Sequence, residues 1–181
     1  MASHIASLIM EAMNAECCQN FAGPKHTLVD FHRMMTRLVE MEDSQYSYRN
    51  VLAAYTSSGI LAGICVAYDG AKLHQLRRRF YEAALEAFGI DYTGMTDETE
   101  DGEFYIDSLA VSSNFRGKGI ASQLLQTTIE RGAELGIPTV GLLVDKGNPK
   151  AEALYQRLGF VYVNDSTWGG HPMRHLQYKQ D

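Results

Sequence analysis

Strand-like and helix-like segments alternate in the C-terminal half of the chain, and this alternation constrains the fold more than any other feature of the sequence. Apolar, β-branched runs predict the strands, and stripes of apolar residues at helical spacing predict the helices. The predicted order is a strand at 104–111, a helix at about 117–135, a strand at 139–144, a helix at 149–158, and strands at 160–163 and 173–178. Such an order builds a parallel or mixed sheet with helices packed on it.

The N-terminal half predicts two amphipathic helices, a hairpin and one more helix. Ile5, Leu8 and Met13 mark the first helical stripe, and a second stripe occupies residues 28–38. Thr27 and Asp30 have the spacing of a capping box at the start of that second helix. Residues 51–55 and 60–68 predict two strands joined by a turn at 57–59, and residues 71–89 predict an inserted helix.

Two charged runs in this region are predicted to face solvent. The three arginines of the inserted helix are expected to pair with glutamates at helical distances, and the acidic run after that helix is expected to form a solvated loop. The arginines are Arg77, Arg78 and Arg79, their expected partners are Glu82 and Glu86, and the acidic run is Asp97, Glu98, Glu100, Asp101 and Glu103.

Length and composition set the outer limits. The 181 residues, 45% of them apolar, predict a single domain over residues 1–181. A net charge of −6 excludes a broad nucleic-acid-binding face, because such a face must be basic. No apolar run approaches the roughly 20 residues that span a bilayer, and the three cysteines suggest a reducing, cytoplasmic setting. The histidines show no metal-ligand spacing, since His171 and His175 stand on a predicted strand.

The glycine-rich segment after the strand at 104–111 is the strongest candidate for binding a ligand. Gly117 and Gly119 allow backbone N–H groups to approach a ligand where a helix begins and its dipole is positive. Arg116 and Lys118 add local positive charge, which outweighs screened charges farther away. The segment therefore predicts a cradle for phosphate groups despite the net negative charge.

Two known phosphate-binding loops do not fit this segment. The dinucleotide fingerprint needs a third glycine, where Ser122 stands, and a Walker loop needs Ser or Thr after Lys118, where Gly119 stands. The pattern that remains is Arg/Gln-x-x-Gly-x-Gly/Ala, which Arg116, Gly119 and Ala121 satisfy.

A second motif occupies residues 148–160 and reads Asn-x-x-Ala-x-x-Leu-Tyr-x-x-x-Gly-Phe. Asn148 can cap a helix, Pro149 suits its first turn, and Gly159 can end it. Tyr155 lies on the same predicted face as three apolar residues.

Together, the two motifs resemble those of the GNAT acyltransferase superfamily, most strongly over residues 103–160. The resemblance implies an α/β (α+β) GNAT fold, with a mixed central sheet of about six or seven strands, helices on both faces and a splayed strand pair that holds CoA. It implies an acetyl-CoA-dependent N-acetyltransferase that needs no metal. The cofactor-binding residues that it implies are Leu109, Ala110, Val111, Arg116, Gly117, Lys118, Gly119, Ile120, Ala121, Ser122, Asn148 and Tyr155.

The chain departs from the family pattern in two places. A strand normally precedes the first helix, whereas helical spacing here starts almost at Met1. The segment that contains the inserted helix is also longer than the family minimum, and it falls where acceptor-binding elements vary.

The chemistry requires a neutral amine, a stabilised oxyanion and an acid near the departing thiolate. The backbone N–H of Val111 is the candidate for the oxyanion, and Tyr155 is the acid that the resemblance implies. Full proton donation by Tyr155 is uphill by about 2 kcal/mol at reference pKa values, so a strengthening hydrogen bond describes its role better. Asp107 is the candidate base, with a structural acid as the alternative, and Glu103 is the reserve. Tyr105, Asp107, Leu109 and Val111 are expected on one face of their strand, opposite Phe104, Ile106, Ser108 and Ala110.

The leading hypothesis is transfer of an acetyl group from acetyl-CoA to a primary amine of a small molecule or peptide by direct attack. The alternative is a CoA-binding regulatory module of the same fold without turnover, and a nucleotide-binding oxidoreductase is a distant third. The expected partners are acetyl-CoA and an amine, with no nucleic acid and no membrane, and a homodimer is left open. Trp168, His171, Tyr46 and Tyr48 remain candidates either for the acceptor pocket or for packing.

Overall fold

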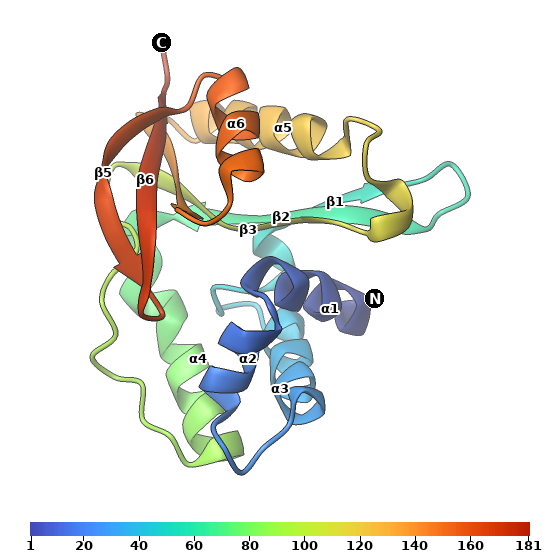
Figure 1. The fold of residues 1–181 in the computed structure, drawn as a ribbon, viewed down its shortest axis with the longest axis vertical. Helices are drawn as coiled ribbons and strands as arrows, with labels where there is room; N and C mark the ends of the chain where they lie inside the picture. The colour runs from blue at the N-terminus through green and yellow to red at the C-terminus, as the bar shows by residue number, and fades with distance from the viewer.

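A six-stranded mixed sheet forms the centre of the computed structural model, which describes residues 1–181 (Figure 1). The strands are β1 (Val51–Tyr55), β2 (Leu61–Asp69), β3 (Glu103–Val111), β4 (Thr139–Asp145), β5 (Val161–Trp168) and β6 (His171–Lys179). Their order is β1-β2-β3-β4-β6-β5, and β3 and β4 are the one parallel pair. The predicted α/β fold with a mixed sheet is confirmed.

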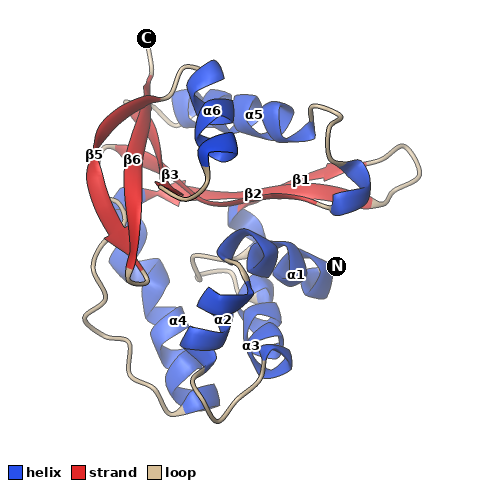
Figure 2. Ribbon diagram, viewed as in Figure 1, coloured by secondary structure: helices blue, strands red, loops and turns tan.

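Helices cover both faces of this sheet, as Figure 2 shows. They are α1 (Ala2–Met13), α2 (Ala15–Ala22), α3 (Leu28–Glu40), α4 (Leu73–Phe88), α5 (Ile120–Glu134) and α6 (Pro149–Arg157). The first four pack on one face around a large apolar cluster, and α5 and α6 pack on the other around a smaller one. None of these helices is long and apolar enough to span a membrane.

The N-terminal region contains three helices rather than the two that the periodicity predicts. Asn14 ends the first helix with a φ of 70°, a positive value that is uncommon outside glycine. Its side chain then accepts a hydrogen bond from the backbone N–H of Cys17 at 2.8 Å and so caps α2. The predicted capping box of Thr27 and Asp30 is confirmed at the start of α3. No strand precedes α1 among residues 1–181.

A β-bulge at Asp107 overturns the simple alternation expected along β3. Val66 lies opposite Ser108, whereas Ala67 lies opposite Ile106, so Asp107 is an extra residue on β3. After the bulge, each side chain of β3 lies on the face of the sheet opposite to the one that strict alternation predicts. Phe104 and Ile106 therefore share a core with Leu109, and Ala110 lies on the opposite face.

The predicted inserted helix is present as α4, but three of the charges predicted to face solvent are buried, namely Arg77, Glu98 and Glu103. The side chain of Arg77 is 1% exposed and pairs with Glu98, which is also buried. The acidic run therefore folds back onto α4. Only Arg78 and Arg79 pair with Glu82, as the spacing predicts, and Glu86 bonds Arg37 of α3 instead.

Glu103 is buried and ties three parts of the sheet together. Its carboxylate accepts hydrogen bonds from Thr99 at 2.8 Å, from Gln177 at 2.7 Å and from His175 Nε2 at 2.6 Å. It lies directly over Gly141 of β4, where a Cβ atom would overlap the carboxylate. These contacts give Glu103 a structural role, away from the cleft described below.

Replacing Gly141 with alanine is expected to lower the free energy of unfolding by about 1–3 kcal/mol, because the buried Glu103 carboxylate has no space to move into. Denaturant unfolding measures this change. In combination with Glu103→Ala, the Gly141→Ala substitution should cost much less than it does alone. Equal costs in the two backgrounds would show that the overlap with Glu103 is not the cause.

Candidate active site

The sheet opens between β3 and β4. Their parallel pairing runs from the Glu103 and Thr139 pair to the Ile106 and Leu142 pair, and no pairing is formed beyond it although both strands continue. A cleft of about 740 Å³ occupies this opening, within the range of small-molecule sites. The splayed strand pair implied by the sequence is therefore present.

Residues from six parts of the chain line the cleft. Besides β3, β4 and the loop after β3, they come from the junction of α1 and α2, from α6, and from the hairpin of β5 and β6. Of the residues singled out in the sequence, the cleft is lined by Asp107, Leu109, Ala110, Val111, Arg116, Gly117, Ala121, Asn148, Tyr155, Trp168 and His171.

The start of α5 forms one wall of the cleft. Gly117 and Gly119 have φ values of 74° and 78°, a left-handed conformation that glycine adopts without strain. Gly119 caps α5 without a side-chain hydrogen bond, so the first backbone N–H groups of the helix stay free for a ligand. The arrangement matches the predicted phosphate cradle.

Four of the predicted cofactor-binding residues lie outside the cleft lining, namely Lys118, Gly119, Ile120 and Ser122. The side chain of Ile120 packs in the core, and Lys118 Nζ lies over the Phe115 ring at 5.4 Å from its centre. Arg116 faces the cleft, but its Nε donates to the Val111 carbonyl at 3.0 Å. From this loop, the cleft is therefore lined only by Arg116, Gly117 and Ala121.

Tyr155 lies on α6 and lines the cleft. Asn148 caps α6 by accepting from the backbone N–H of Ala151 at 3.2 Å, as the motif predicts. The Tyr155 ring packs edge-on against Phe160 at 6.0 Å. Burial raises the pKa of the Tyr155 hydroxyl above its ordinary value, so the phenol stays protonated at neutral pH. It is therefore a hydrogen-bond donor in the cleft.

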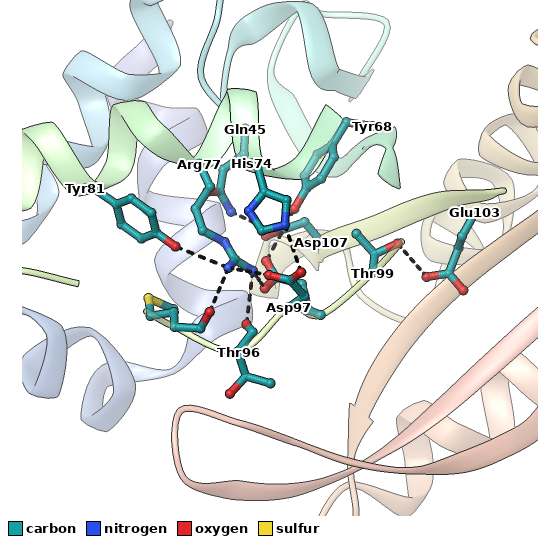
Figure 3. Close-up of polar contacts among 12 residues, drawn as sticks. Gln45, Tyr68, His74, Arg77, Tyr81, Thr96, Asp97, Thr99, Glu103 and Asp107 are labelled. Carbon is teal, nitrogen blue, oxygen red and sulfur yellow. Dashed lines mark hydrogen bonds and ion pairs between the residues drawn. The ribbon is translucent and has the colours of Figure 1, made fainter. Parts of the chain in front are cut away.

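Asp107 lies at the bulge of β3 and faces the cleft floor. Its carboxylate accepts from Ser108 at 2.9 Å. It also accepts from Tyr68 at 3.1 Å and from Gln45 at 3.3 Å (Figure 3). Burial raises the pKa of Asp107, while these three donors and Arg77 oppose the rise. The structure thus gives Asp107 the hydroxyl partners of a structural acid together with the cleft-lining position that a base requires.

The junction of α1 and α2 contributes residues that the sequence analysis missed. Glu11, Asn14 and Cys17 line the cleft beside β3, and Glu11 pairs with Arg116 at 3.5 Å. The signal available was Asn14, because an Asn between two apolar helical stretches is a common cap and turn residue. On the far side, Lys150 and Arg157 of α6 add positive charge that the sequence motifs did not highlight.

The aromatic candidates divide between the cleft and the core. Trp168 lines the cleft and also packs on the core, with its ring 5.6 Å from the Phe21 ring. His171 lines the cleft near Asp145. Tyr46 is buried in the core, and Tyr48 bonds the exposed Glu42.

Comparison with known proteins agrees with this geometry. The family model for the acetyltransferase (GNAT) family matches residues 34–160. A solved structure described as an acetyltransferase superposes with a TM-score of 0.77 at 26% identity, covering 98% of this chain and 94% of the other. The chain therefore belongs to the GNAT acetyltransferase family.

Curated relatives resemble parts of the chain. An uncharacterized N-acetyltransferase of Bacillus subtilis is 42% identical over 62 residues, which are 34% of this chain and 40% of the relative. The chloroplastic GCN5-related N-acetyltransferase 4 of Arabidopsis thaliana is 26% identical over 174 residues, which are 87% of this chain and 60% of the relative. The chain thus spans 40% and 60% of the lengths of these two relatives.

Proposed function

We propose that this protein is an N-acetyltransferase that moves the acetyl group of acetyl-CoA to a primary amine of a small molecule or peptide. The observation that carries the proposal is the cleft between β3 and β4, which is lined by a phosphate cradle and by Tyr155. Membership of an acetyltransferase family supports it. The function is assigned to residues 1–181 as a single cytoplasmic domain.

Acetyl-CoA suits the chemistry of the cleft. The free N–H groups at the start of α5 suit a pyrophosphate, and the cleft-lining cations Arg116, Lys150 and Arg157 suit its negative charge. A pantetheine arm needs backbone partners. The backbone N–H of Ser112 bonds Ala62 of β2, so the alternation along β3 turns the N–H groups of Val111 and Leu109 toward the open side.

A residue that lines the cleft is assigned to each chemical step of the transfer. Asp107, directly or through water, takes a proton from the ammonium form of the acceptor, and the freed amine attacks the thioester carbonyl. The Val111 N–H donates to the oxygen that becomes negative in the tetrahedral intermediate. Tyr155 donates a hydrogen bond to the sulfur as the C–S bond breaks and charge develops there.

The acceptor is assigned to the part of the cleft lined by Asp107, Trp168 and His171, because the cleft-lining cations are assigned to the phosphates. Asp107 gives this part a negative charge that favours a cationic amine over an anionic one. A protonated primary amine is such a cation at neutral pH.

Release of free thiol from acetyl-CoA over a panel of amines tests the proposal. We expect thiol release that depends on the acceptor and an acetylated amine of the corresponding mass, with cationic amines preferred. Aliphatic amines matched in size, with and without an added carboxylate, provide the control for charge. Tight CoA binding without acceptor-dependent release would instead support the regulatory module.

A further inference from the structure

A buried polar cluster adjoins Asp107, and its members Tyr68 and Arg77 do not line the cleft (Figure 3). Tyr68 of β2 places its hydroxyl 3.1 Å from Asp107 Oδ2 and 3.5 Å from Glu98 Oε1. Glu98 comes from the loop between α4 and β3, and it is 7% exposed. One hydroxyl therefore bridges two carboxylates, of which only Asp107 lines the cleft.

The charges in this cluster do not balance when both carboxylates are ionised. Arg77 is the one cation that contacts the pair, and it bonds Glu98 directly. Arg77 is also shared with Asp97, at 3.3 Å, and with the carbonyl groups of Met95 and Thr96. A second buried negative charge is costly without a partner, so adding one proton to the two carboxylates is favourable.

The hydrogen-bond directions allow that proton to rest on Glu98. Ser108, Gln45 and Tyr68 all donate to Asp107, which therefore serves as the ionised member. With Tyr68 donating to Asp107, a protonated Glu98 can donate in turn to the Tyr68 oxygen. Every proton in the chain from Glu98 through Tyr68 to Asp107 then has an acceptor.

We propose that Glu98 is the proton store of the acetyl transfer, receiving through Tyr68 the proton that Asp107 removes from the acceptor ammonium. This proposal rests on the proposed function, and it makes Glu98 a positioning residue because Glu98 does not touch the substrate. The store is supplied by the loop that follows the inserted helix α4.

An ammonium group that becomes an amide loses two protons, of which one ends on the CoA sulfur and the other is released. The released proton passes first to Asp107. Asp107 then gives this proton to the Tyr68 oxygen, while the Tyr68 hydroxyl gives its own proton to Glu98. Asp107 is ionised again while the amide and thiol are still bound, so it cannot return the proton to them. The proton leaves by the same route once the products have gone.

Several titratable groups surround the store and set its proton affinity. Arg77 of α4 faces it, as do the tyrosines Tyr46, Tyr68 and Tyr105 and the carboxylates Asp97 and Asp107. Burial, with the charge of Asp107 as the next cause, raises the pKa of Glu98 to about 7. Glu98 therefore carries a proton below that pH and is free to accept one above it.

Steady-state kinetics with one fixed amine test the store, because the ionisation of that amine is then common to all variants. In the unmodified protein we expect kcat/KM to rise with pH through about 7. Glu98→Gln should lower the maximal kcat about tenfold and move this rise to lower pH, and Tyr68→Phe should lower kcat by a similar factor. Asp97→Asn is the matched control, since it also removes a carboxylate from Arg77 but does not reach Tyr68. Its profile should be unchanged.

Infrared spectroscopy gives a second readout that does not depend on turnover, and its first result, on the unmodified full chain, needs no variant. A protonated-carboxyl band should disappear as the pH rises through about 7, be missing in Glu98→Gln, and shift to lower pH in Asp107→Asn. Absence of that band, or a Glu98→Gln profile equal to that of Asp97→Asn, would overturn the store. If the band is present but no amine causes thiol release, the proposed function is contradicted, while the protonation of Glu98 still stands.

Discussion

Replacing Tyr155 with phenylalanine is expected to lower kcat for acetyl transfer about 100-fold, the lower end of the effect of a positioned acid. The substitution removes only the hydroxyl, so the ring remains packed on Phe160 and the cleft keeps its shape. Binding of acetyl-CoA should change little, because the hydrogen bond to sulfur gains strength only as the thiolate forms. Steady-state kinetics and calorimetric titration with acetyl-CoA, in the absence of an acceptor amine, measure the two quantities.

Tyr178 provides the matched control for Tyr155. Its ring packs on the same Phe160 at 5.9 Å, but it lies outside the cleft lining. Tyr178→Phe should therefore leave kcat within about twofold of the unmodified value, as for a substitution away from the site. Equal kcat values in the two variants would remove Tyr155 from the mechanism, and a large loss of CoA binding in Tyr155→Phe would make it a binding residue instead.

Replacing Arg77 with methionine is expected to lower the free energy of unfolding by about 3–5 kcal/mol, as for other buried ion pairs that lose one partner. The side chain of Arg77 is 1% exposed and that of Glu98 is 3% exposed, so neither water nor another cation can take over the lost contact. The carbonyl groups of Met95 and Thr96 would lose a donor as well. Denaturant unfolding at pH 8, above the pKa of Glu98 of about 7, shows the effect in full, because Glu98 is ionised there.

Arg78 is the matched control for this prediction, one residue further along α4. Its side chain is 64% exposed and pairs with Glu82 at 3.7 Å on the surface, so Arg78→Met should change stability by about 0.5 kcal/mol or less. The cost of Arg77→Met should also shrink as the pH falls below 7, since Glu98 then becomes neutral on its own. A cost that is small at pH 8 and independent of pH would contradict the ion-pair explanation.

The cleft could be located from the sequence because its walls depend on short-range signals. Gly117, Gly119 and Asn148 act through backbone conformation and helix capping, and such requirements appear at fixed spacing in the sequence. The open strand pair was implied by the family resemblance that these motifs carry. The strands and most helices were predicted for a similar reason, since one buried face imposes a regular apolar period.

The features that could not be predicted depend on contacts between distant segments. Arg77 looks like its neighbours Arg78 and Arg79 in the sequence, and only the packing of the 97–103 loop on α4 distinguishes it. The bulge at Asp107 is likewise set by pairing with β2. Strict alternation therefore assigned the later residues of β3 to the wrong faces. The junction at Asn14 was missed because α2 has only 8 residues.

The opening between β3 and β4 has a thermodynamic consequence for the whole protein. A continuous parallel pair would satisfy the backbone groups of residues 107–111 and 143–145, whereas the open pair leaves those on the facing edges to water or to a ligand. A ligand that bonds to these groups acts as a guest strand and completes the sheet. Its binding energy then adds to the stability of the native state by mass action. The melting temperature of the protein and the rate of amide exchange in β3 and β4 thus measure how much of the cleft is occupied by ligand.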